Sequence, residues 1–158
     1  MSALMKNLRF IRWELIVLCA LPLTRFLLEL SGVPYNVTEF ISLWGFQLIL
    51  VVVLPFRIVR NGFGKYGSLW VLTGLCCLIG FEVVALLVAV NYLHPMHTSY
   101  AENGTTHFPY TPLQHLFYHI FLTPIESTFA TGLVATPIYF LARGIRAGHS
   151  TATGTSTS

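Results

Sequence analysis

Four long apolar stretches constrain the fold of this chain more than any other feature of its sequence. They run from Trp13 to Leu30, Phe40 to Pro55, Leu69 to Leu93 and Leu113 to Leu141. About 20 apolar residues in a helix are enough to cross the hydrocarbon core of a bilayer. The sequence therefore predicts an all-α protein, a four-helix transmembrane bundle with short loops.

The composition agrees with a membrane protein and leaves no room for a separate soluble domain. Hydrophobic residues make up 54% of the chain and charged residues only 9%, whereas about 25% of residues are charged in ordinary soluble domains. We expect residues 1–148 to form a single four-span membrane domain. Residues 150–158 contain only Ser, Thr, Gly and Ala, so we expect residues 149–158 to be a disordered tail.

The basic residues indicate how the chain is oriented. Eight of the nine Lys and Arg residues lie before the first stretch, between the second and third, or after the fourth, and the connections 31–38 and 94–111 contain none. Cytoplasmic loops carry this excess of basic residues. We therefore expect an integral protein of the plasma or inner membrane with both termini cytoplasmic. The net charge of +3 suits contact with anionic membrane lipids, and we expect no nucleic-acid partner.

Each stretch contains one strongly polar side chain in or near the outer half of the predicted membrane. These side chains are Arg25, Gln47, Glu82 and Glu126. A charged residue near the bilayer centre costs about 2.5–3.5 kcal/mol, so such residues usually face the bundle and find partners. We expect these four to meet in one ligand-binding site, with Glu29 competing for Arg25 from one helical turn away.

This polar group has two interpretations. In the first, the site opens to the outer face and serves proton-linked transport or binding of a small ligand. Arg25 then holds an anionic group or one acid, and Glu82 or Glu126 takes up the proton. In the second, the charges set helix packing in a non-catalytic subunit of a membrane complex. Four helices are few for a transport path, so we expect a homo-oligomer or a larger complex in either case.

Histidines add a second candidate site near the outer surface. His115 and His119 are four residues apart and share a helix face with Glu126, so they form a stripe suited to proton entry. His94 and His97 are three apart after the third stretch. Together the four histidines have the chemistry to bind Zn or Cu. A third interpretation of the chain is therefore an outward-facing metal- or haem-binding membrane protein, with the cofactor left open between Zn, Cu and haem. Ordinary hydrogen bonding of interfacial histidines is the alternative.

No catalytic signature is present in the sequence. It has no Gly-rich phosphate loop and no nucleophile elbow, and it contains no Asp for a Ser–His–Asp triad. One backbone feature does favour a functional site. Pro124 removes the hydrogen-bond donor for the carbonyl of Ile120, and such breaks are tolerated in membranes where the backbone lines a cavity.

Overall fold

The computed structural model describes the backbone of residues 2–94, 96, 98–100 and 111–154 and, residues 43 and 148–154 apart, their side chains. Within these ranges every regular element is helical, which confirms the predicted all-α class. The elements are α1 (Ala3–Phe10), α2 (Arg12–Leu30), α3 (Tyr35–Gln47), η1 (Leu48–Val53), α4 (Leu54–Asn61), α5 (Tyr66–Leu93), α7 (Pro112–Phe117), η2 (Tyr118–Leu122) and α8 (Thr123–Gly154).

Among the described residues, three helical runs are long and apolar enough to cross a bilayer. They are Tyr35–Asn61, which joins α3, η1 and α4, then α5, and lastly Pro112–Ala147, which joins α7, η2 and most of α8. The first predicted span corresponds to α2, which is 19 residues long but carries four charged side chains. Length and composition therefore support three spanning helices, where the sequence predicts four.

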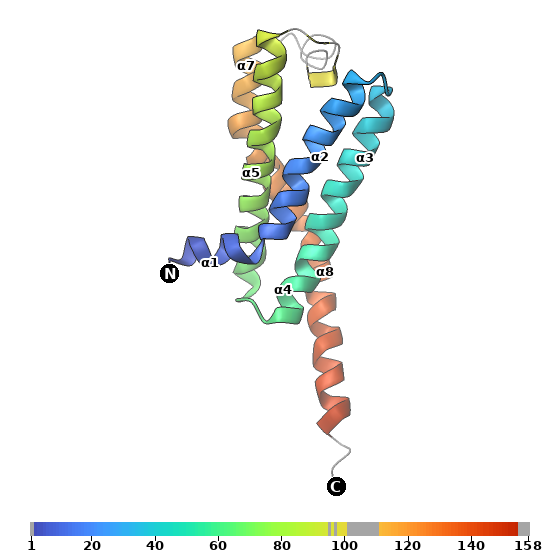
Figure 1. Cartoon of the computed structure of the whole chain (residues 1–158). Helices are drawn as coiled ribbons and strands as arrows, with labels where there is room; N and C mark the ends of the chain where they lie inside the picture. The colour runs from blue at the N-terminus through green and yellow to red at the C-terminus, as the bar shows by residue number, and fades with distance from the viewer. Residues whose placement is uncertain (1, 95, 97, 101–110, 155–158) are drawn as a thin grey trace.

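The long helices pack along one another. α5 contacts both α8 and α2, α2 also packs against α3, and α4 packs against α8 (Figure 1). Their shared core contains Leu18 of α2, Leu50 of η1, Leu72 and Cys76 of α5, and Ala135 of α8, all of them almost fully buried. Each long helix thus contributes apolar side chains to one interior, and α1 projects sideways from the start of α2.

Two of the helical runs contain a π-helical segment, and a proline follows each of these segments. η1 ends at Val53, two residues before Pro55, and η2 ends at Leu122, two residues before Pro124. A proline lacks the N–H that would bond the carbonyl four residues earlier. A π-turn uses the N–H five residues on, which lies just beyond the proline. The widened turn therefore lets the helix continue through a position that would otherwise break it.

The C-terminal helix is longer than the sequence predicts. We expect a disordered tail from residue 149, but the backbone of α8 remains helical to Gly154. No proline follows Pro137 to interrupt the backbone hydrogen bonds. The end of the predicted tail, residues 155–158, lies outside the described residues.

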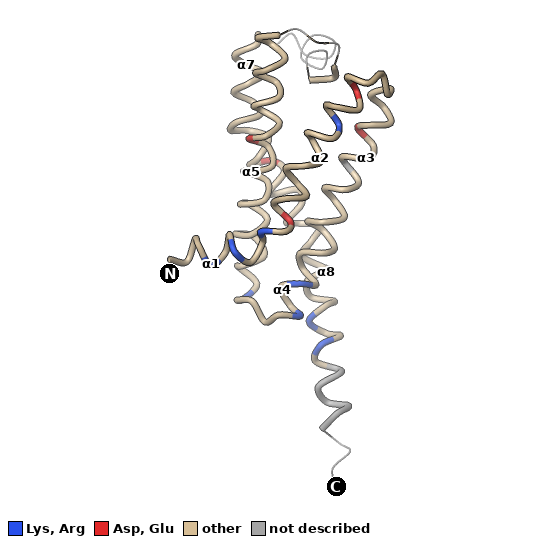
Figure 2. Tube along the Cα trace, in the orientation of Figure 1, with Lys and Arg blue, Asp and Glu red and all other residues tan. Residues whose placement is uncertain are grey.

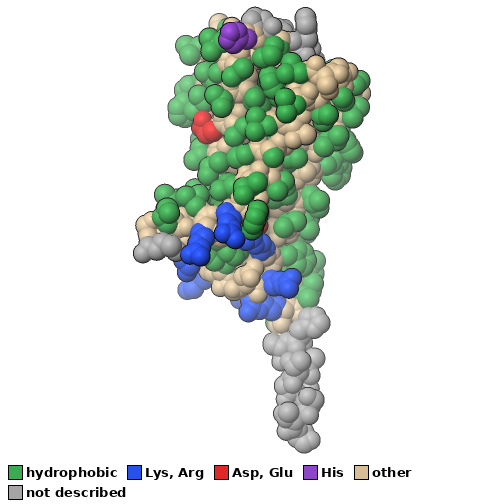
Figure 3. Space-filling view, in the orientation of Figure 1, with side chains coloured by type: hydrophobic (Ala, Val, Ile, Leu, Met, Phe, Trp, Pro, Cys, Tyr) green, Lys and Arg blue, Asp and Glu red, His purple; other side chains and the backbone are tan. Residues whose placement is uncertain are grey.

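Charge is distributed unevenly along the helices. Lys and Arg gather at the end that holds α1, α4 and the exposed part of α8 (Figure 2), and α2 carries one more, Arg25, in its second half. Figure 3 shows Lys and Arg side chains on one face gathered in a belt below a surface made largely of hydrophobic side chains. A belt of this kind beside an apolar surface is what a protein at a membrane interface presents.

Candidate functional site

The most complete polar contact in the structure joins Arg25 to Glu29. The Arg25 Nε atom donates to Glu29 Oε1 at 2.8 Å, and one of its terminal nitrogens donates to the Ser99 hydroxyl at 2.7 Å. Glu29 also accepts hydrogen bonds from the Thr38 hydroxyl at 2.7 Å and from the backbone N–H of Ser99 at 2.8 Å. Four residues from α2, α3 and the segment after α5 thus satisfy one another.

The structure therefore pairs Arg25 with Glu29, the competing acid one turn away, and not with Glu82 or Glu126. The side chains of Arg25 and Glu29 are 14% and 4% exposed, so water screens the pair little. A buried charge that is already paired has little capacity left for a ligand's opposite charge. The charge of Arg25 is thus neutralised by Glu29.

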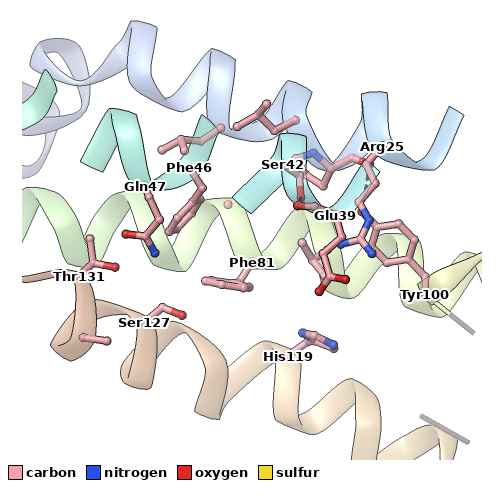
Figure 4. Close-up of a pocket in the computed structure, with 16 residues that line it drawn as sticks. Arg25, Glu39, Ser42, Phe46, Gln47, Phe81, Tyr100, His119, Ser127 and Thr131 are labelled. Carbon is pink, nitrogen blue, oxygen red and sulfur yellow. Dashed lines mark hydrogen bonds between the residues drawn. The ribbon is translucent and has the colours of Figure 1, made fainter. Parts of the chain in front are cut away.

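Beside this network lies a pocket of about 300 Å³ between α2, α3, α5 and the run from η2 into α8. Figure 4 shows the Phe46 and Phe81 rings facing this space, with the Glu39 carboxylate and the Gln47 amide directed into it. Arg25 lines the same pocket. The structure thus brings together two of the predicted ligand-binding residues, Arg25 and Gln47. Their acidic neighbour in the pocket is Glu39.

Tyr100 closes the pocket beside Arg25. Its hydroxyl donates to the Pro22 carbonyl at 3.1 Å, and its ring meets Phe26 edge-on at 5.9 Å between centroids. The Arg25 guanidinium lies 5.4 Å from the centre of the same ring. Burial raises the pKa of Tyr100 to about 12, so the hydroxyl stays protonated and keeps donating. The wall on this side is therefore fixed by contacts on three sides of one ring.

A hydrogen-bonded chain of three side chains ends at the pocket. The Tyr92 hydroxyl lies 2.9 Å from His115 Nδ1, and His115 Nε2 lies 3.0 Å from His119 Nε2. His119 Nδ1 is buried and, among the residues that the structure describes, has no hydrogen-bond partner. Buried polar atoms are nearly always bonded. Since His119 also lines the pocket, a ligand there is well placed to supply the missing bond.

The chain has two neutral arrangements of its protons. If Tyr92 donates to His115, then His115 donates to His119, and His119 Nδ1 carries a proton. If the direction is reversed, His119 Nδ1 is an acceptor. The switch from the first arrangement to the second passes a proton from Tyr92 to His115 and another from His115 to His119. It releases the proton of His119 Nδ1 at the pocket and takes one up at the Tyr92 hydroxyl, so the geometry is that of a proton relay.

The structure does not bring Glu126 into the pocket, although its spacing predicts that it shares a face with His119. Seven residues separate them, which returns an α-helix almost to the same face. His119 lies in η2, however, and a π-turn adds a residue to the turn. The shared face therefore recurs one residue later, at Ser127, which does line the pocket. Glu126 is exposed and accepts a hydrogen bond from the Tyr118 hydroxyl at 2.8 Å.

Glu82 also lies outside the pocket, for a simpler reason. Its neighbour Phe81 faces the pocket, and successive residues of a helix point about 100° apart. Glu82 is accordingly exposed on the flank of α5. The predicted meeting of Glu82 and Glu126 with Arg25 in one site is therefore not what the helix phases produce.

The predicted metal ligands are only partly placed. His115 and His119 lie together, whereas His94 is exposed at the C-terminal end of α5 and His97 lies outside the described residues. In the part of the chain that the structure describes, no three His, Cys, Asp or Glu side chains form a cluster suited to a metal. In the structure, His115 and His119 therefore contact each other, and they also contact Tyr92 and the pocket, respectively.

Sequence reasoning missed four residues that build the site: Glu39, Tyr92, Thr38 and Ser99. Glu39 lies one residue before the predicted start of its span. Extending the predicted span by one residue would have included it. Tyr92 is an aromatic residue at a helix end, which is typical of any membrane protein. Ser99 and Thr38 belong to connections, where no periodic pattern shows what their hydroxyl groups contact.

The chain matches no protein-family model, no curated protein and no solved structure. A function is therefore inferred from the geometry of the chain itself. In that geometry, the pocket beside His119 Nδ1 is the feature that most clearly calls for a ligand.

Proposed function

We propose that this chain is an integral membrane protein with four spans and cytoplasmic termini that binds a small ligand in the pocket and couples binding to a proton. α2 serves as the fourth span. Its 19 residues reach about 28 Å as a helix, close to the thickness of the hydrocarbon core. Glu14, Arg25 and Glu29 are each paired inside the protein, which offsets the cost that their charges would otherwise impose.

The observation that carries the ligand proposal is the unpartnered His119 Nδ1 atom in the wall of an aromatic pocket. Phe46 and Phe81 suit an apolar or aromatic body. Arg25 is already neutralised by Glu29, so Glu39 leaves the pocket wall with a net negative charge. The ligand that fits best is a small amine, with its ring against the Phe46 and Phe81 rings, which contact each other at 5.7 Å between centroids, and its cationic group toward Glu39.

The relay through His115 and Tyr92 supports the proton link. A ligand that bonds to His119 Nδ1 as a donor or as an acceptor selects one of the two proton arrangements. Releasing the ligand allows the other arrangement, and each switch takes up a proton at one end of the relay and releases one at the other. In this proposal His119 and Glu39 take the role that the sequence suggests for Glu82 and Glu126.

Phenethylamine, with 2-phenylethanol and phenylacetate as neutral and anionic counterparts, tests the pocket in protein purified into lipid nanodiscs. We expect calorimetry to show binding of the amine in preference to both counterparts. Glu39 is exposed in the structure, so Glu39→Gln should weaken amine binding about threefold to fivefold, because an exposed ion pair contributes up to about 1 kcal/mol. Glu82→Gln removes a carboxylate outside the pocket and should change the affinity less than about twofold.

A second experiment tests the proton link. It uses protein reconstituted into lipid vesicles that contain a pH-sensitive dye. The neutral amine crosses lipid by itself and takes up a proton inside, so vesicles without protein set the baseline. An amine gradient should change the internal pH faster than this baseline with the parent protein and not with His119→Asn. Equal amine affinity in Glu39→Gln and the parent contradicts the ligand site. Equal pH changes in His119→Asn and the parent contradict the relay.

A second candidate function is that of a non-catalytic subunit, and exposed acids favour it. Glu82 and Glu126 lie on exposed flanks of helical runs that are apolar enough to cross a membrane, where a charged side chain facing lipid is costly. A partner with a basic or hydrogen-bonding group would cover them. If Glu82→Gln and Glu126→Gln reduce the size of the assembly in light scattering while amine binding is absent, the subunit interpretation is favoured.

A further inference from the structure

A second pocket lies at the opposite end of the molecule, among the basic residues. It has a volume of about 420 Å³ and is formed by α1, the start of α2, the end of α4 and the turn that follows. Its lining residues include four cations and no acid: Lys6, Arg9, Phe10, Arg12, Trp13, Arg57, Asn61 and Phe63. A concave surface with this charge is suited to an anion.

One of the four cations holds the pocket together. Arg57 forms an ion pair with Glu14 of α2, which is only 4% exposed, and donates a further hydrogen bond to the Phe10 carbonyl at 2.7 Å. The guanidinium thereby joins α4 to the end of α1 and the start of α2. The Phe10 and Phe63 rings stack at 3.9 Å between centroids. These contacts fix the three walls relative to one another.

The other three cations are available to a ligand. Lys6, Arg9 and Arg12 are exposed, and neither of the ion pairs found in the described residues includes them. The Lys6 amino group lies over the Phe63 ring at 5.4 Å, which holds it at the pocket rim. With Arg57 neutralised by Glu14, these three side chains give the pocket a net charge of about +3 at neutral pH.

The position of the pocket indicates where its ligand comes from. α1 projects sideways at the level of the basic belt (Figures 1 and 3), so the pocket opens beside the apolar surface. Leu4 and Met5 of α1 and Trp13 are all more than half exposed, at 54%, 56% and 58%. A short helix with exposed apolar residues and basic neighbours is typical of an element that lies in the membrane interface.

We propose that this pocket binds the phosphate group of an anionic phospholipid in the cytoplasmic leaflet. Arg9 and Arg12 contact the phosphate oxygens, and Lys6 adds a third positive charge beside them. The exposed side chains of Leu4, Met5 and Trp13 lie among the upper acyl chains. Basic pockets on the cytoplasmic side of membrane proteins recognise lipid headgroups in this way. This inference rests on the proposed membrane insertion and is independent of the amine pocket.

The experiment compares dioctanoyl phosphatidylglycerol, dioctanoyl phosphatidylcholine and orthophosphate as probes of the purified full chain in neutral detergent. Native mass spectrometry measures the affinity of each. We expect the anionic lipid to bind at least about tenfold more tightly than the zwitterionic lipid, because each basic residue near an anionic surface contributes a factor of about five.

Two charge-matched variants separate this pocket from general attraction to basic protein. The pocket variant replaces its three available cations: Lys6→Gln, Arg9→Gln and Arg12→Gln. The control variant removes three cations from the same end of the molecule, all of them outside the pocket lining: Arg60→Gln, Lys65→Gln and Arg143→Gln. The pocket variant should lose at least about twentyfold in affinity for phosphatidylglycerol, and the control less than about threefold.

Two results overturn the proposal. Equal losses in the two variants mean that the lipid responds only to net charge. Displacement of the lipid by orthophosphate at an equal concentration means that the pocket takes a free anion. Two controls are measured on the same variants. Resistance to alkaline carbonate extraction from cell membranes reports membrane insertion, and phenethylamine binding reports the amine pocket. A failure of lipid binding alone is thereby distinguished from a failure of either of these.

Discussion

At the scale of single residues, the buried charges of this chain are neutralised inside the protein. The side chains of Glu29 and Glu14 are each 4% exposed, and each meets an arginine. Removing one member of a buried ion pair typically costs about 3–5 kcal/mol, because the other charge loses its compensation, whereas replacing both by apolar residues is often nearly neutral. These pairs are therefore where single substitutions should act most strongly on stability.

Glu29→Gln should lower the free energy of unfolding by about 3 kcal/mol. Arg25 would keep its charge, while an amide can neither neutralise it nor accept with both of its terminal atoms from Thr38 and Ser99. The measurement is denaturation by increasing sodium dodecyl sulfate, followed by circular dichroism. Glu82→Gln is the control and should change stability by less than about 0.5 kcal/mol.

The double variant Arg25→Met with Glu29→Leu sharpens this prediction. If burial of an uncompensated charge is the cause, the double variant should be more stable than Glu29→Gln. A loss below about 1 kcal/mol in Glu29→Gln would mean instead that water or lipid headgroups reach Arg25.

At the scale of elements, the π-helical segments decide which side chains share a face. Without η2, His119 and Glu126 would line up, and with it His119 lines up with Ser127. Because an inserted residue rotates everything that follows by about 100°, one turn before Pro124 changes the composition of the pocket. The chemistry of the site thus depends on a local response of the backbone to a proline.

The contact between α5 and α8 depends on one small residue. A Cβ atom on Gly132 would lie 2.5–2.9 Å from three atoms of the Trp70 ring, whereas a Cβ on Gly144 of the same helix would meet nothing within 4 Å. The absence of a side chain at Gly132 therefore lets the tryptophan ring pack directly on the backbone of α8.

Gly132→Ala should lower the free energy of unfolding by about 1–3 kcal/mol, because the ring or one of the helices has to move. Gly144→Ala makes the same chemical change without a neighbour and should be neutral or slightly stabilising, since alanine favours the helix by about 1 kcal/mol. Denaturation of both variants in the same detergent measures the difference. Equal effects would show that Trp70 adjusts at no cost.

At the scale of the whole molecule, charge separates the two ends. Eight of the nine Lys and Arg residues lie at the end with α1 and α4 or beyond it along α8, and the pocket with Glu39 and His119 lies toward the other end. The positive-inside bias orients such a molecule with its basic end in the cytoplasm. The amine pocket would then open toward the outer leaflet and the basic pocket toward the inner one.

Cysteine labelling of intact cells tests this orientation. In a background with Cys19, Cys76 and Cys77 replaced by Ala, a membrane-impermeant maleimide should label Ser31→Cys and not Lys65→Cys. Both positions are exposed in the structure, so their difference reports the side of the membrane. Permeabilised cells provide the control, because both positions should then be labelled. Labelling of Lys65→Cys in intact cells, or of both positions, would contradict the proposed topology.

The sequence anticipates the helical elements better than the site. Apolar stretches and prolines are local properties, so the helices appear close to where they are expected, and Arg25, Gln47 and His119 are found at one pocket. Glu82 and Glu126 are displaced because a helix turns by about 100° per residue. An error of one residue in phase moves a side chain from the pocket to the outer surface.

By itself, the sequence determined the helical class, the apolar runs and the separation of basic residues from the opposite end, because hydrophobicity and charge accumulate along the chain. The sequence also offers the pair of Arg25 and Glu29, one turn apart in one helix, whereas only the tertiary structure decided that Arg57 meets Glu14. It also decided that Glu39 shares the pocket with His119. These contacts depend on helix phase and on the register between helices, and a single π-turn changes both without altering the hydrophobic pattern.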